Sequence, residues 1–409
     1  MLIGIDASRA FVARRTGTET YSFNLIRALI GLGTAHRFRL YVNEVTSPPA
    51  PPLRGEGSEV TSPPAPPLRG EGSEVTSPPA PPLRGEGSVE IRAIPFPRLW
   101  THVRLSAEML VRPPDVLFVP AHVLPLVHPQ RCVVTVHDLG YLRYPEAHRP
   151  ADRRYLDWST RWNARQATVV LADSQATKDD LVRAYGVDPD KVRVVYLGRE
   201  ETLGPVRDPA RLAAVRERYG LGRRYLLYVG TLQPRKNLAR VIEAFARIAG
   251  RPASADVQLV LAGKRGWLYD DLFAQVERMG LGGRVLLPGY VAEADLPALL
   301  SGALAFVFPS LYEGFGIPVL EAGACEVPVI TSNTSSLPEV AGDAALFVDP
   351  HDVDAIAEAM YRLITDPDLR ADLIRRGREN VRRFSWEKCA RETLAVLEEV
   401  GRRGDKAMR

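Results

Sequence analysis

The chain has 409 residues, of which 45% are hydrophobic and 25% are charged, and its net charge is +4. This length exceeds what one hydrophobic core usually organises, so we expect two domains, and the composition is typical of a soluble globular enzyme. The three cysteines, Cys132, Cys325 and Cys389, are far apart in sequence. This spacing and the odd number argue against a disulfide framework or a thiolate metal site.

In the first half of the chain, short apolar runs typical of buried parallel strands alternate with segments typical of helices. We expect strands at 2–6, 38–42, 89–94, 116–119, 132–136, 169–172 and 192–196. We expect helices at 18–32, 153–165 and 178–185. Asp173 and Ser174, followed by Thr177, offer cap chemistry for the last of these helices. The first run, at 2–6, lacks the basic segment of a signal peptide.

An insertion separates the second and third expected strands. The 15-residue segment 44–58 recurs unchanged at 59–73 and at 74–88. Its proline, glycine and serine content cannot support a core, so we expect a disordered, proline-rich triple repeat. A docking arm is one interpretation. We favour a recently duplicated stretch without a role, whose deletion would leave activity and stability nearly unchanged.

The window between Ile91 and Arg165 is unusually basic. It holds 11 arginines, no lysine, 6 acidic residues and five of the seven histidines. Such a surface could contact anionic lipid, a phosphorylated acceptor or nucleic acid, although an ordinary solvated surface explains it equally well. No stretch of the chain approaches the roughly 18 apolar residues that a membrane span needs. We therefore expect a cytoplasmic protein, with peripheral contact at the inner membrane face left open.

The second half repeats the alternating pattern. We expect strands at 225–229, 258–262, 284–287, 305–308 and 327–331, with helices at 237–249, 270–278, 295–300 and 317–324. The polar stretch 198–222 marks the boundary, and the segment 352–400 is helical with breaks near 366–367 and 384–385. We predict an α/β protein with an N-terminal Rossmann-like domain (1–200), a C-terminal Rossmann-like domain (201–375) and a helical tail (376–409).

The stretch from Glu313 to Glu321 carries the strongest chemical signal. It follows a buried strand, and Pro318 suits the first position of a helix. Glu313 then lies at the carboxyl end of a strand, where open α/β sheets bind ligands, and Glu321 lies in the first turn of the helix. Two carboxylates suit hydroxyl groups, and amides beside Gly314 and Gly316 suit phosphate. Alternatively, Glu313 is merely solvated and Glu321 only favours the helix dipole.

A second loop, Gly230-Thr-Leu-Gln-Pro-Arg-Lys-Asn237, connects a strand to a helix. Arg235 and Lys236 stand just before the expected helix, where two cations and helix amides suit a diphosphate. The alternative is a solvated loop with Asn237 as a plain helix cap. No strand is followed by Gly-x-Gly-x-x-Gly, and the chain has no Gly-x-x-x-x-Gly-Lys-Ser/Thr, which disfavours a nicotinamide or P-loop site.

Two features of the first half complete the candidate site. His137 and Asp138 end a buried strand, where an imidazole can bond a sugar hydroxyl or move a proton, or simply be a satisfied polar residue. Gly17 and Thr18 precede the first helix and form a candidate amide cradle, or a turn.

Three blocks, Val136-His-Asp138, Gly230 to Asn237 and Glu313 to Glu321, resemble those of the GT-B-fold retaining glycosyltransferases of family 4, also called group 1. The resemblance covers nearly the whole chain outside 44–88 and is nearest to bacterial mannosyltransferases of surface-polysaccharide synthesis. It implies two doubly wound Rossmann-like domains that face a central cleft. It also implies a metal-independent transfer without a permanently bound cofactor.

The resemblance also implies individual roles. Glu313 would contact hydroxyls of the donor sugar and Glu321 the ribose, while Arg235 and Lys236 would bind the diphosphate and stabilise the leaving charge. His137 would contact the sugar near its reacting carbon, and Gly17 would approach the phosphate or the acceptor. The remaining implied donor-binding residues lie in the two donor loops: Gly230, Gly314, Phe315, Gly316 and Ile317.

The implied donor is a nucleotide-diphosphate sugar, with GDP-mannose ahead of a UDP-sugar, and the implied acceptor is a saccharide or a polyprenyl-linked saccharide. Nucleic acid is not an expected partner. Two departures from the family pattern are Thr231, where many relatives carry arginine, and the single glycine at Gly17. A nucleotide-sugar 2-epimerase of the same fold and a catalytically silent sugar-nucleotide-binding scaffold remain alternatives.

Overall fold

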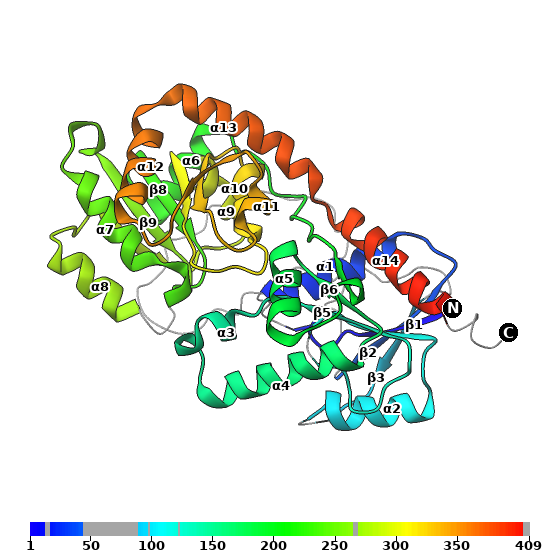
Figure 1. Ribbon diagram of the computed structural model, residues 1–409. Coiled ribbons are helices and arrows are strands. Elements are labelled where there is room, and N and C mark those ends of the chain that lie inside the picture. Colours follow the sequence, from blue (N-terminus) through cyan, green and yellow to red (C-terminus); the bar gives the residue numbers. More distant parts are fainter. Residues whose placement is uncertain (13–16, 44–88, 97–98, 122, 265–268, 404–409) are drawn as a thin grey trace, which may run out of the picture.

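The computed structural model describes residues 1–12, 17–43, 89–96, 99–121, 123–264 and 269–403. This part of the chain forms two parallel α/β sheets, each flanked by helices (Figure 1). The insert at 44–88 lies outside the described residues.

The first sheet has the order β3-β2-β1-β4-β5-β6-β7. Its strands are β1 (Leu2–Asp6), β2 (Arg37–Val42), β3 (Val89–Ala93), β4 (Val116–Val119), β5 (Cys132–Val136), β6 (Val169–Ala172) and β7 (Val192–Val194). The second sheet has the order β10-β9-β8-β11-β12-β13. Its strands are β8 (Arg224–Val229), β9 (Val257–Ala262), β10 (Val285–Gly289), β11 (Ala305–Phe308), β12 (Val329–Ser332) and β13 (Ala345–Val348).

The helices follow the strands closely along the chain. They are α1 (Gly17–Gly31), α2 (Ser106–Val111), α3 (Gly140–Arg143), α4 (Pro150–Gln166), α5 (Gln175–Tyr185), α6 (Pro209–Arg218), α7 (Leu238–Ala249), α8 (Tyr269–Arg278), α9 (Leu296–Ser301), α10 (Ile317–Ala324), α11 (Leu337–Ala341), α12 (Val353–Thr365), α13 (Pro367–Asn380) and α14 (Trp386–Arg403). Short helical turns are η1 (Thr101–Leu105), η2 (Pro145–Ala147), η3 (Pro189–Lys191), η4 (Pro234–Lys236), η5 (Pro252–Ser254) and η6 (Val381–Arg383).

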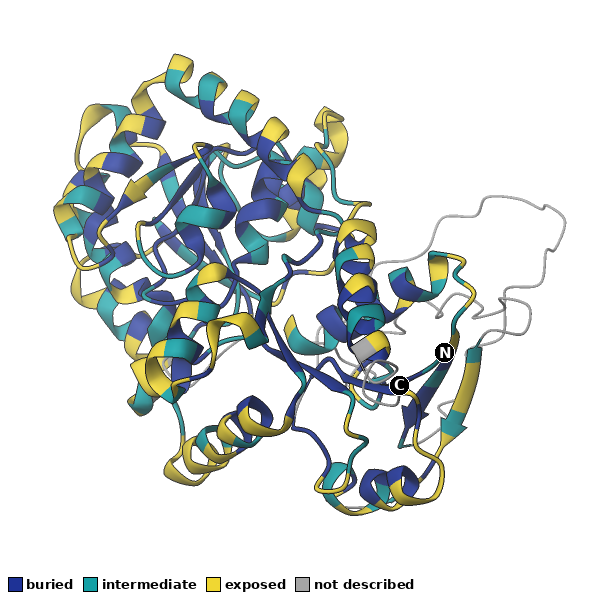
Figure 2. Cartoon of the chain, turned by 45° about the vertical axis from the view of Figure 1, so that its right-hand side comes forward, coloured by how far each residue is buried: buried dark blue, intermediate teal, exposed yellow. Residues whose placement is uncertain are grey.

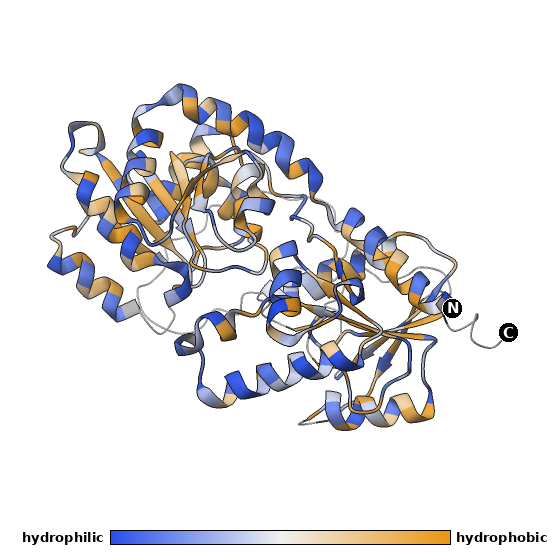
Figure 3. Cartoon of the chain, viewed as in Figure 1, coloured by the Kyte–Doolittle hydropathy of each residue, from blue (hydrophilic) through white to orange (hydrophobic). Residues whose placement is uncertain are grey.

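Both sheets are doubly wound. The strand order reverses between β1 and β4 in the first sheet and between β8 and β11 in the second, and such switch points open a crevice at the carboxyl ends of the strands. The inner strands β4, β5, β6 and β11 are buried at every residue, which explains their continuous apolar runs (Figures 2 and 3). The expected α/β class and parallel sheets are confirmed.

The boundary stretch 198–222 is more ordered than its polar composition suggested. Helix α6 occupies ten of its residues, with Pro209 in the first turn and the Asp208 side chain accepting the Ala210 N–H at 3.0 Å. Proline therefore marks a helix start here and not a loop. Strand β13 and the short helices α2, α3 and α11 were also missed, because their segments are too short to show a clear period.

The C-terminal helices connect the two sheets. Helix α12 packs beside α7 on the second sheet, whereas α14 returns to the first sheet and lies against α1 (Figure 1). Helices α1 and α14 share one hydrophobic core. Helix α1 contributes Tyr21, Leu25 and Leu29, and α14 contributes Ala390, Leu394 and Leu397. The helical tail is thus a structural part of the first half. The domain limits at 200 and 375 stay a prediction.

The insert joins two strands that run parallel. Phe38 pairs with Val89 and Val42 with Ala93, so the carboxyl end of β2 and the amino end of β3 lie at opposite ends of this strand pair. Parallel neighbours need a crossover of about a dozen residues or more. Deleting all of 44–88 would remove that connection entirely, so the expected neutrality of this deletion is revised. One 15-residue copy meets the length requirement.

Candidate functional site

Three charged side chains meet where β8 and β11 end. Arg235 and Lys236 lie in η4 after β8, and Glu313 follows the adjacent strand β11. Arg235 Nη1 donates to Glu313 Oε2 and to the Tyr312 carbonyl, both at 2.9 Å, and Lys236 Nζ donates to Glu313 Oε1. The sequence-predicted cations and carboxylate are therefore in direct contact. They form a triad of two positive charges and one negative charge.

The triad is largely removed from water. Glu313 and Lys236 are 7% and 8% exposed. Burial disfavours the Glu313 carboxylate, but Arg235 and Lys236 outweigh it and lower the pKa of Glu313 to about 2. Burial lowers the pKa of Lys236, and the Glu313 carboxylate opposes that change. The ammonium also lies over the Phe308 ring, with Nζ 4.9 Å from the ring centroid. A buried triad with an excess positive charge is a favourable place for an anion.

Asn237 fixes the loop that carries the two cations. Its backbone is left-handed (φ 64°), and its side chain makes no helix-cap hydrogen bond. Instead, Nδ2 donates to the carbonyls of Pro309 at 3.1 Å and Pro350 at 2.6 Å. Asn237 therefore occupies the N-cap position of α7, as considered from the sequence, but its side chain does not cap the helix. Asparagine tolerates the left-handed conformation and ties the η4 loop to the loop after β11.

His137 lies at the carboxyl end of β5 with both ring nitrogens engaged. Nδ1 is 2.6 Å from Asp173 Oδ2, and Nε2 is 3.0 Å from the Pro120 carbonyl. Burial disfavours the imidazolium, but the Asp173 carboxylate outweighs this and raises the pKa of His137. The sequence indicates only a helix-capping role for Asp173, which lies two residues before helix α5. Ser174 is the actual cap, and it accepts the Thr177 N–H at 3.0 Å.

The loop from Gly314 to Ile317 packs directly on the first domain. A Cβ atom on Gly314 would lie 2.2 Å from the His137 carbonyl oxygen, so only glycine fits. Phe315 is buried against the rings of Tyr196 and Phe384, with centroids 6.1 and 5.7 Å away. Gly316 caps α10 with φ 114°, a conformation that favours glycine, and Ile317 begins the helix.

Two contacts between the domains were not anticipated. Tyr312 donates its hydroxyl to Asp180 at 2.9 Å and accepts the Leu139 N–H at 3.2 Å. Glu339 accepts the N–H groups of Gln175 and Ala176, the first residues of α5, at 2.9 and 3.0 Å. These partners are more than 130 residues apart, and no local sequence pattern announces them. They hold the carboxyl ends of the two sheets against each other.

Glu321 lies apart from the triad. Helix α10 begins at Ile317, so Glu321 is in its second turn, and the first-turn placement expected from the sequence is wrong. Burial, aided by the negative charge of Glu200, raises the pKa of Glu321 to about 7. The two glutamates of the stretch therefore occupy opposite electrostatic environments.

The two remaining predicted glycines differ in their surroundings. Gly17 is exposed at the start of α1, and a Cβ atom there would meet nothing within 4 Å. Gly230 has φ 153°, and its carbonyl oxygen would lie 1.9 Å from a Cβ atom on Gly263 after β9. The backbones following β8 and β9 thus approach closely at the edge where the triad lies. Thr231 accepts the Tyr228 hydroxyl through its carbonyl at 3.1 Å.

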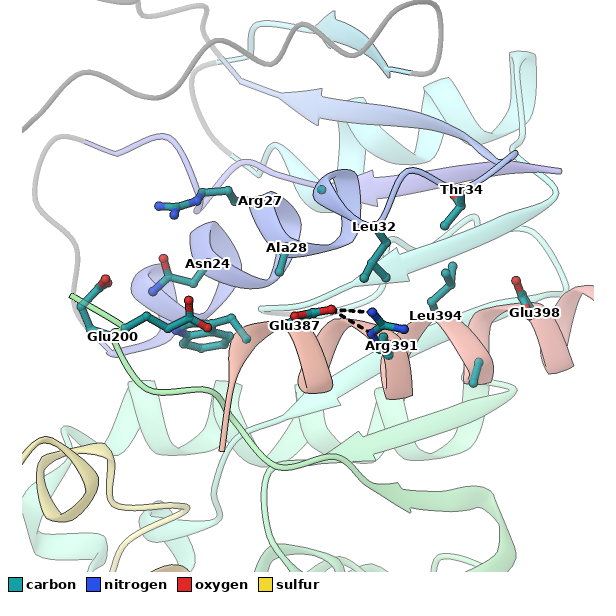
Figure 4. Close-up of a pocket in the computed structure, with 14 residues that line it drawn as sticks. Asn24, Arg27, Ala28, Leu32, Thr34, Glu200, Glu387, Arg391, Leu394 and Glu398 are labelled. Carbon is teal, nitrogen blue, oxygen red and sulfur yellow. Dashed lines mark hydrogen bonds and ion pairs between the residues drawn. The ribbon is translucent and has the colours of Figure 1, made fainter. Parts of the chain in front are cut away.

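A cavity of about 580 Å³ lies elsewhere, between α1, residues 200–201 and α14 (Figure 4). Its Arg391 side chain is paired with Glu387, with Nε and Oε1 3.1 Å apart. None of the predicted site residues lines it, and we place the candidate site at the sheet edges. Within the described residues, no group of three or more His, Cys, Asp or Glu side chains is arranged to hold a metal ion.

Comparison with known proteins agrees with this geometry. Residues 15–202 match the family described as Glycosyltransferase Family 4, and residues 215–380 match Glycosyl transferases group 1. O-antigen chain mannosyltransferase B of Escherichia coli is 38% identical over 267 residues, which cover 65% of this chain and 69% of that protein. The chain belongs to the family 4 (group 1) glycosyltransferases. Alpha-maltose-1-phosphate synthase of Mycolicibacterium smegmatis is 31% identical over 301 residues, 68% of this chain and 76% of that protein.

Solved structures identify the fold as that of the GT-B glycosyltransferases. Anabaena Alr3699/HepE in complex with UDP and glucose superposes with a TM-score of 0.68 and 18% identity, covering 97% of this chain and 99% of that chain. Sucrose-phosphate synthase from Thermosynechococcus elongatus gives a TM-score of 0.69 and 21% identity, with 98% of each chain covered. The expected GT-B architecture is confirmed.

Proposed function

We propose that this glycosyltransferase moves a mannosyl residue from a nucleotide-diphosphate sugar, GDP-mannose ahead of a UDP-sugar, to a saccharide or polyprenyl-linked saccharide, with retention of configuration. The observation that carries the proposal is the buried Arg235–Lys236–Glu313 triad at the carboxyl ends of β8 and β11. The mannosyl assignment is supported by the name of the O-antigen mannosyltransferase relative, and a diphosphate donor by a fold neighbour that holds UDP.

The triad suits a diphosphate next to a sugar. Two cations and one carboxylate leave one positive charge uncompensated in a low-dielectric site, where an anionic phosphate gains more than it would in water. Glu313 can then accept hydroxyl groups of the transferred sugar while Arg235 and Lys236 hold the phosphate oxygens. The ion pairs fix all three side chains before the donor binds, which reduces the ordering cost of binding.

The chemical step follows from this arrangement. The bond between the anomeric carbon and the phosphate oxygen breaks, and the electron pair goes to the departing nucleoside diphosphate. The acceptor hydroxyl oxygen forms the new bond on the same face, and its proton passes to that phosphate oxygen. Arg235 and Lys236 stabilise the negative charge that develops there, and the proposed mechanism calls for no metal ion.

His137 and Glu321 complete the proposal. His137, held by Asp173, is positioned to bond a sugar hydroxyl through Nε2 if that nitrogen exchanges the Pro120 carbonyl for the ligand. Glu321 would accept a ribose hydroxyl. Gly17, Gly230 and the Gly314 to Ile317 loop would contact the donor through their backbone. A cytoplasmic location, where nucleotide sugars occur, follows from this donor class.

Calorimetric titration with GDP, UDP, ADP and dTDP, followed by the matching sugar donors, tests the donor assignment. We expect one diphosphate to bind saturably and Lys236→Ala to abolish that binding. Exposed Arg247, paired with Glu243 on α7, provides the control Arg247→Ala, which should bind normally. A folded protein that binds none of the diphosphates would contradict the proposal.

Product analysis separates the remaining alternatives. A transferase needs an acceptor hydroxyl and forms a glycoside whose anomeric configuration, read by NMR, matches that of the donor. Turnover of the donor without any acceptor, giving its 2-epimer, would assign the epimerase instead. Saturable binding without turnover of any donor and acceptor pair would assign the silent scaffold.

A further inference from the structure

The outward face of helix α2 is apolar, the reverse of an ordinary surface helix. Leu110 and Val111 are 69% and 73% exposed, and Val103 on the preceding turn η1 is 46% exposed. The charged side chain of this segment points inward instead. Glu108 is buried and paired with Arg92 and Arg104. Amphipathic helices of soluble proteins bury their apolar side, so α2 presents a face that lacks a partner among the described residues.

Helix α4 presents aromatic side chains beside this face. Tyr155 and Trp158 are 47% and 42% exposed, and Trp158 stacks on Trp162 with ring centroids 6.2 Å apart. Their spacing of three and four residues places them on one side of the helix. Tyrosine and tryptophan have an apolar ring with one polar atom, and they gather where an apolar phase meets water.

The two helices belong to one continuous surface. His102 of η1 lies 3.2 Å from the Tyr155 hydroxyl, and Val127, in the exposed Leu126–Val127 turn, donates its N–H to Ser106 of α2 at 3.2 Å. Helices α2 and α4 lie along the same side of the first domain (Figures 1 and 2). We name this surface the α2–α4 face. Ten of the 14 exposed large hydrophobic side chains among the described residues fall between residues 91 and 158.

The helices of the α2–α4 face and the residues next to them also carry exposed arginines. The exposed ones are Arg112, Arg149, Arg153, Arg154, Arg161 and Arg165. Nearby acids are partly neutralised, since Glu108 is paired inside and Asp157 accepts Arg161 Nε at 3.0 Å. The face therefore combines aliphatic tips, interfacial aromatic rings and an excess of positive charge.

We propose that the α2–α4 face docks on an anionic lipid bilayer, with Leu110, Val111 and Trp158 inserted at the headgroup level and the arginines on the phosphates. Apolar burial and attraction to anionic headgroups add, and together they give stable but reversible attachment. None of the described helices is long and apolar enough to cross a membrane, and this mode of attachment needs none. The proposal rests on the surface itself and does not depend on the donor assigned above.

The composition of the face favours lipid over other occupants. A saccharide would use the aromatic rings but gains little from exposed leucine and valine tips. A second copy of the chain would bring the same arginines against each other, and like charges in an interface are unfavourable. An anionic membrane complements both the charge and the aliphatic side chains.

Vesicle sedimentation tests the proposal on the full chain. We expect binding to vesicles of phosphatidylethanolamine and phosphatidylglycerol, weak binding to phosphatidylcholine alone, and weakening by added salt. The double variant Leu110→Ser with Val111→Ser should bind at least about tenfold more weakly, because two inserted aliphatic side chains are lost. Arg154→Glu with Arg165→Glu should lose its preference for phosphatidylglycerol.

Matched controls come from the second domain. Phe273 is 50% exposed on α8, and Arg278 is exposed on the same helix. Phe273→Ser and Arg278→Glu should bind vesicles like the unaltered protein, and transfer to a water-soluble acceptor should be unchanged in all four variants. Equal vesicle binding by the α2–α4 variants and the controls would overturn the proposal. So would a concentration-dependent dimer in sedimentation velocity that only the α2–α4 substitutions abolish.

Discussion

The two ends of the Glu313 to Glu321 stretch place the same side chain in opposite environments. Glu313, in the loop after β11, contacts two cations, and its pKa falls to about 2. Glu321, one turn into α10, forms no ion pair within the described part of the chain, and burial together with the negative charge of Glu200 raises its pKa to about 7. From the sequence alone, Glu313 and Glu321 are two equivalent hydrogen-bond acceptors. The structure makes one a permanent anion and the other a group that titrates near neutrality.

The difference shows which part of the site is built for charge. The fixed charges at the Glu313 end can orient a diphosphate and a sugar, whereas a carboxyl group like Glu321 can both donate and accept hydrogen bonds near neutral pH. Substitutions at the two ends should therefore have different consequences.

The largest effect is expected for Lys236→Ala. It removes a buried cation from Glu313 and from the proposed diphosphate site, and we expect kcat/KM to fall by about 100-fold or more. Steady-state transfer rates measure this loss, and Arg247→Ala, at an exposed ion pair, should stay within about twofold. A rate like that of the unaltered protein would remove Lys236 from the site.

Glu313→Gln should reduce transfer by more than about tenfold while nucleoside diphosphate binding persists, since both cations remain. The protein should stay folded but lose stability near neutral pH. The pKa of Glu313 is depressed in the folded state, so its contribution is present above about pH 4.5 and is lost as the pH falls toward 2. Melting temperatures of the two proteins should converge on acidification. A constant difference from pH 7 to pH 3 would contradict the assigned environment.

Glu321→Gln should show the opposite pH dependence. The pKa of Glu321 is raised on folding, so its carboxyl group favours the folded state below pH 4.5 and this advantage is lost as the pH rises through about 7. The variant should match the unaltered protein at pH 4.5 and melt about 2–4 °C higher at pH 8. Scanning calorimetry at the two pH values decides this, and a lower melting temperature at pH 8 would be inconsistent with burial as the cause.

A smaller effect is expected where Glu339 joins the two domains. Glu339→Gln weakens the acceptor for two N–H groups at the start of α5 and removes a charge favoured by that helix terminus, at a cost of about 1 kcal/mol. Urea denaturation measures the loss. The exposed Glu379, 3.7 Å from Arg375, gives the control Glu379→Gln, which should leave the midpoint unchanged. Equal shifts in both variants would argue against a specific contact.

The smallest effect is expected for shortening the insert, which lies outside the surroundings of Glu313 and Glu321. Deleting residues 59–88 keeps one repeat copy as the crossover between β2 and β3, and shortening a long connection changes stability by less than about 1 kcal/mol. Transfer rate and melting temperature should stay nearly the same, whereas deletion of all of 44–88 should destabilise the first sheet. Tolerance of the complete deletion would mean that β3 is dispensable for the fold.

Much of the fold was predictable from the sequence. Continuous apolar runs located 132–136, 169–172 and 305–308 to the residue, because inner parallel strands are covered on both faces and read as unbroken hydrophobic segments. Helix α6 and strand β13 were not predicted, because the periodicity of hydrophobic residues in short or polar segments is too weak to distinguish them from loops. The return of α14 to α1 could not be predicted, because no local pattern records which sheet a helix joins.

The sequence by itself determined the strand and helix alternation, the type of fold, and the residues that stand at the ends of β5, β8 and β11. Only the tertiary structure decided how these residues are paired. Glu313 meets Lys236 across 77 residues of chain, and Glu339 meets Gln175 across 164. Glu313 and Glu321 are the same residue type, but their charge states differ, because the charge state of a carboxyl group depends on its neighbours in space and on the exclusion of water.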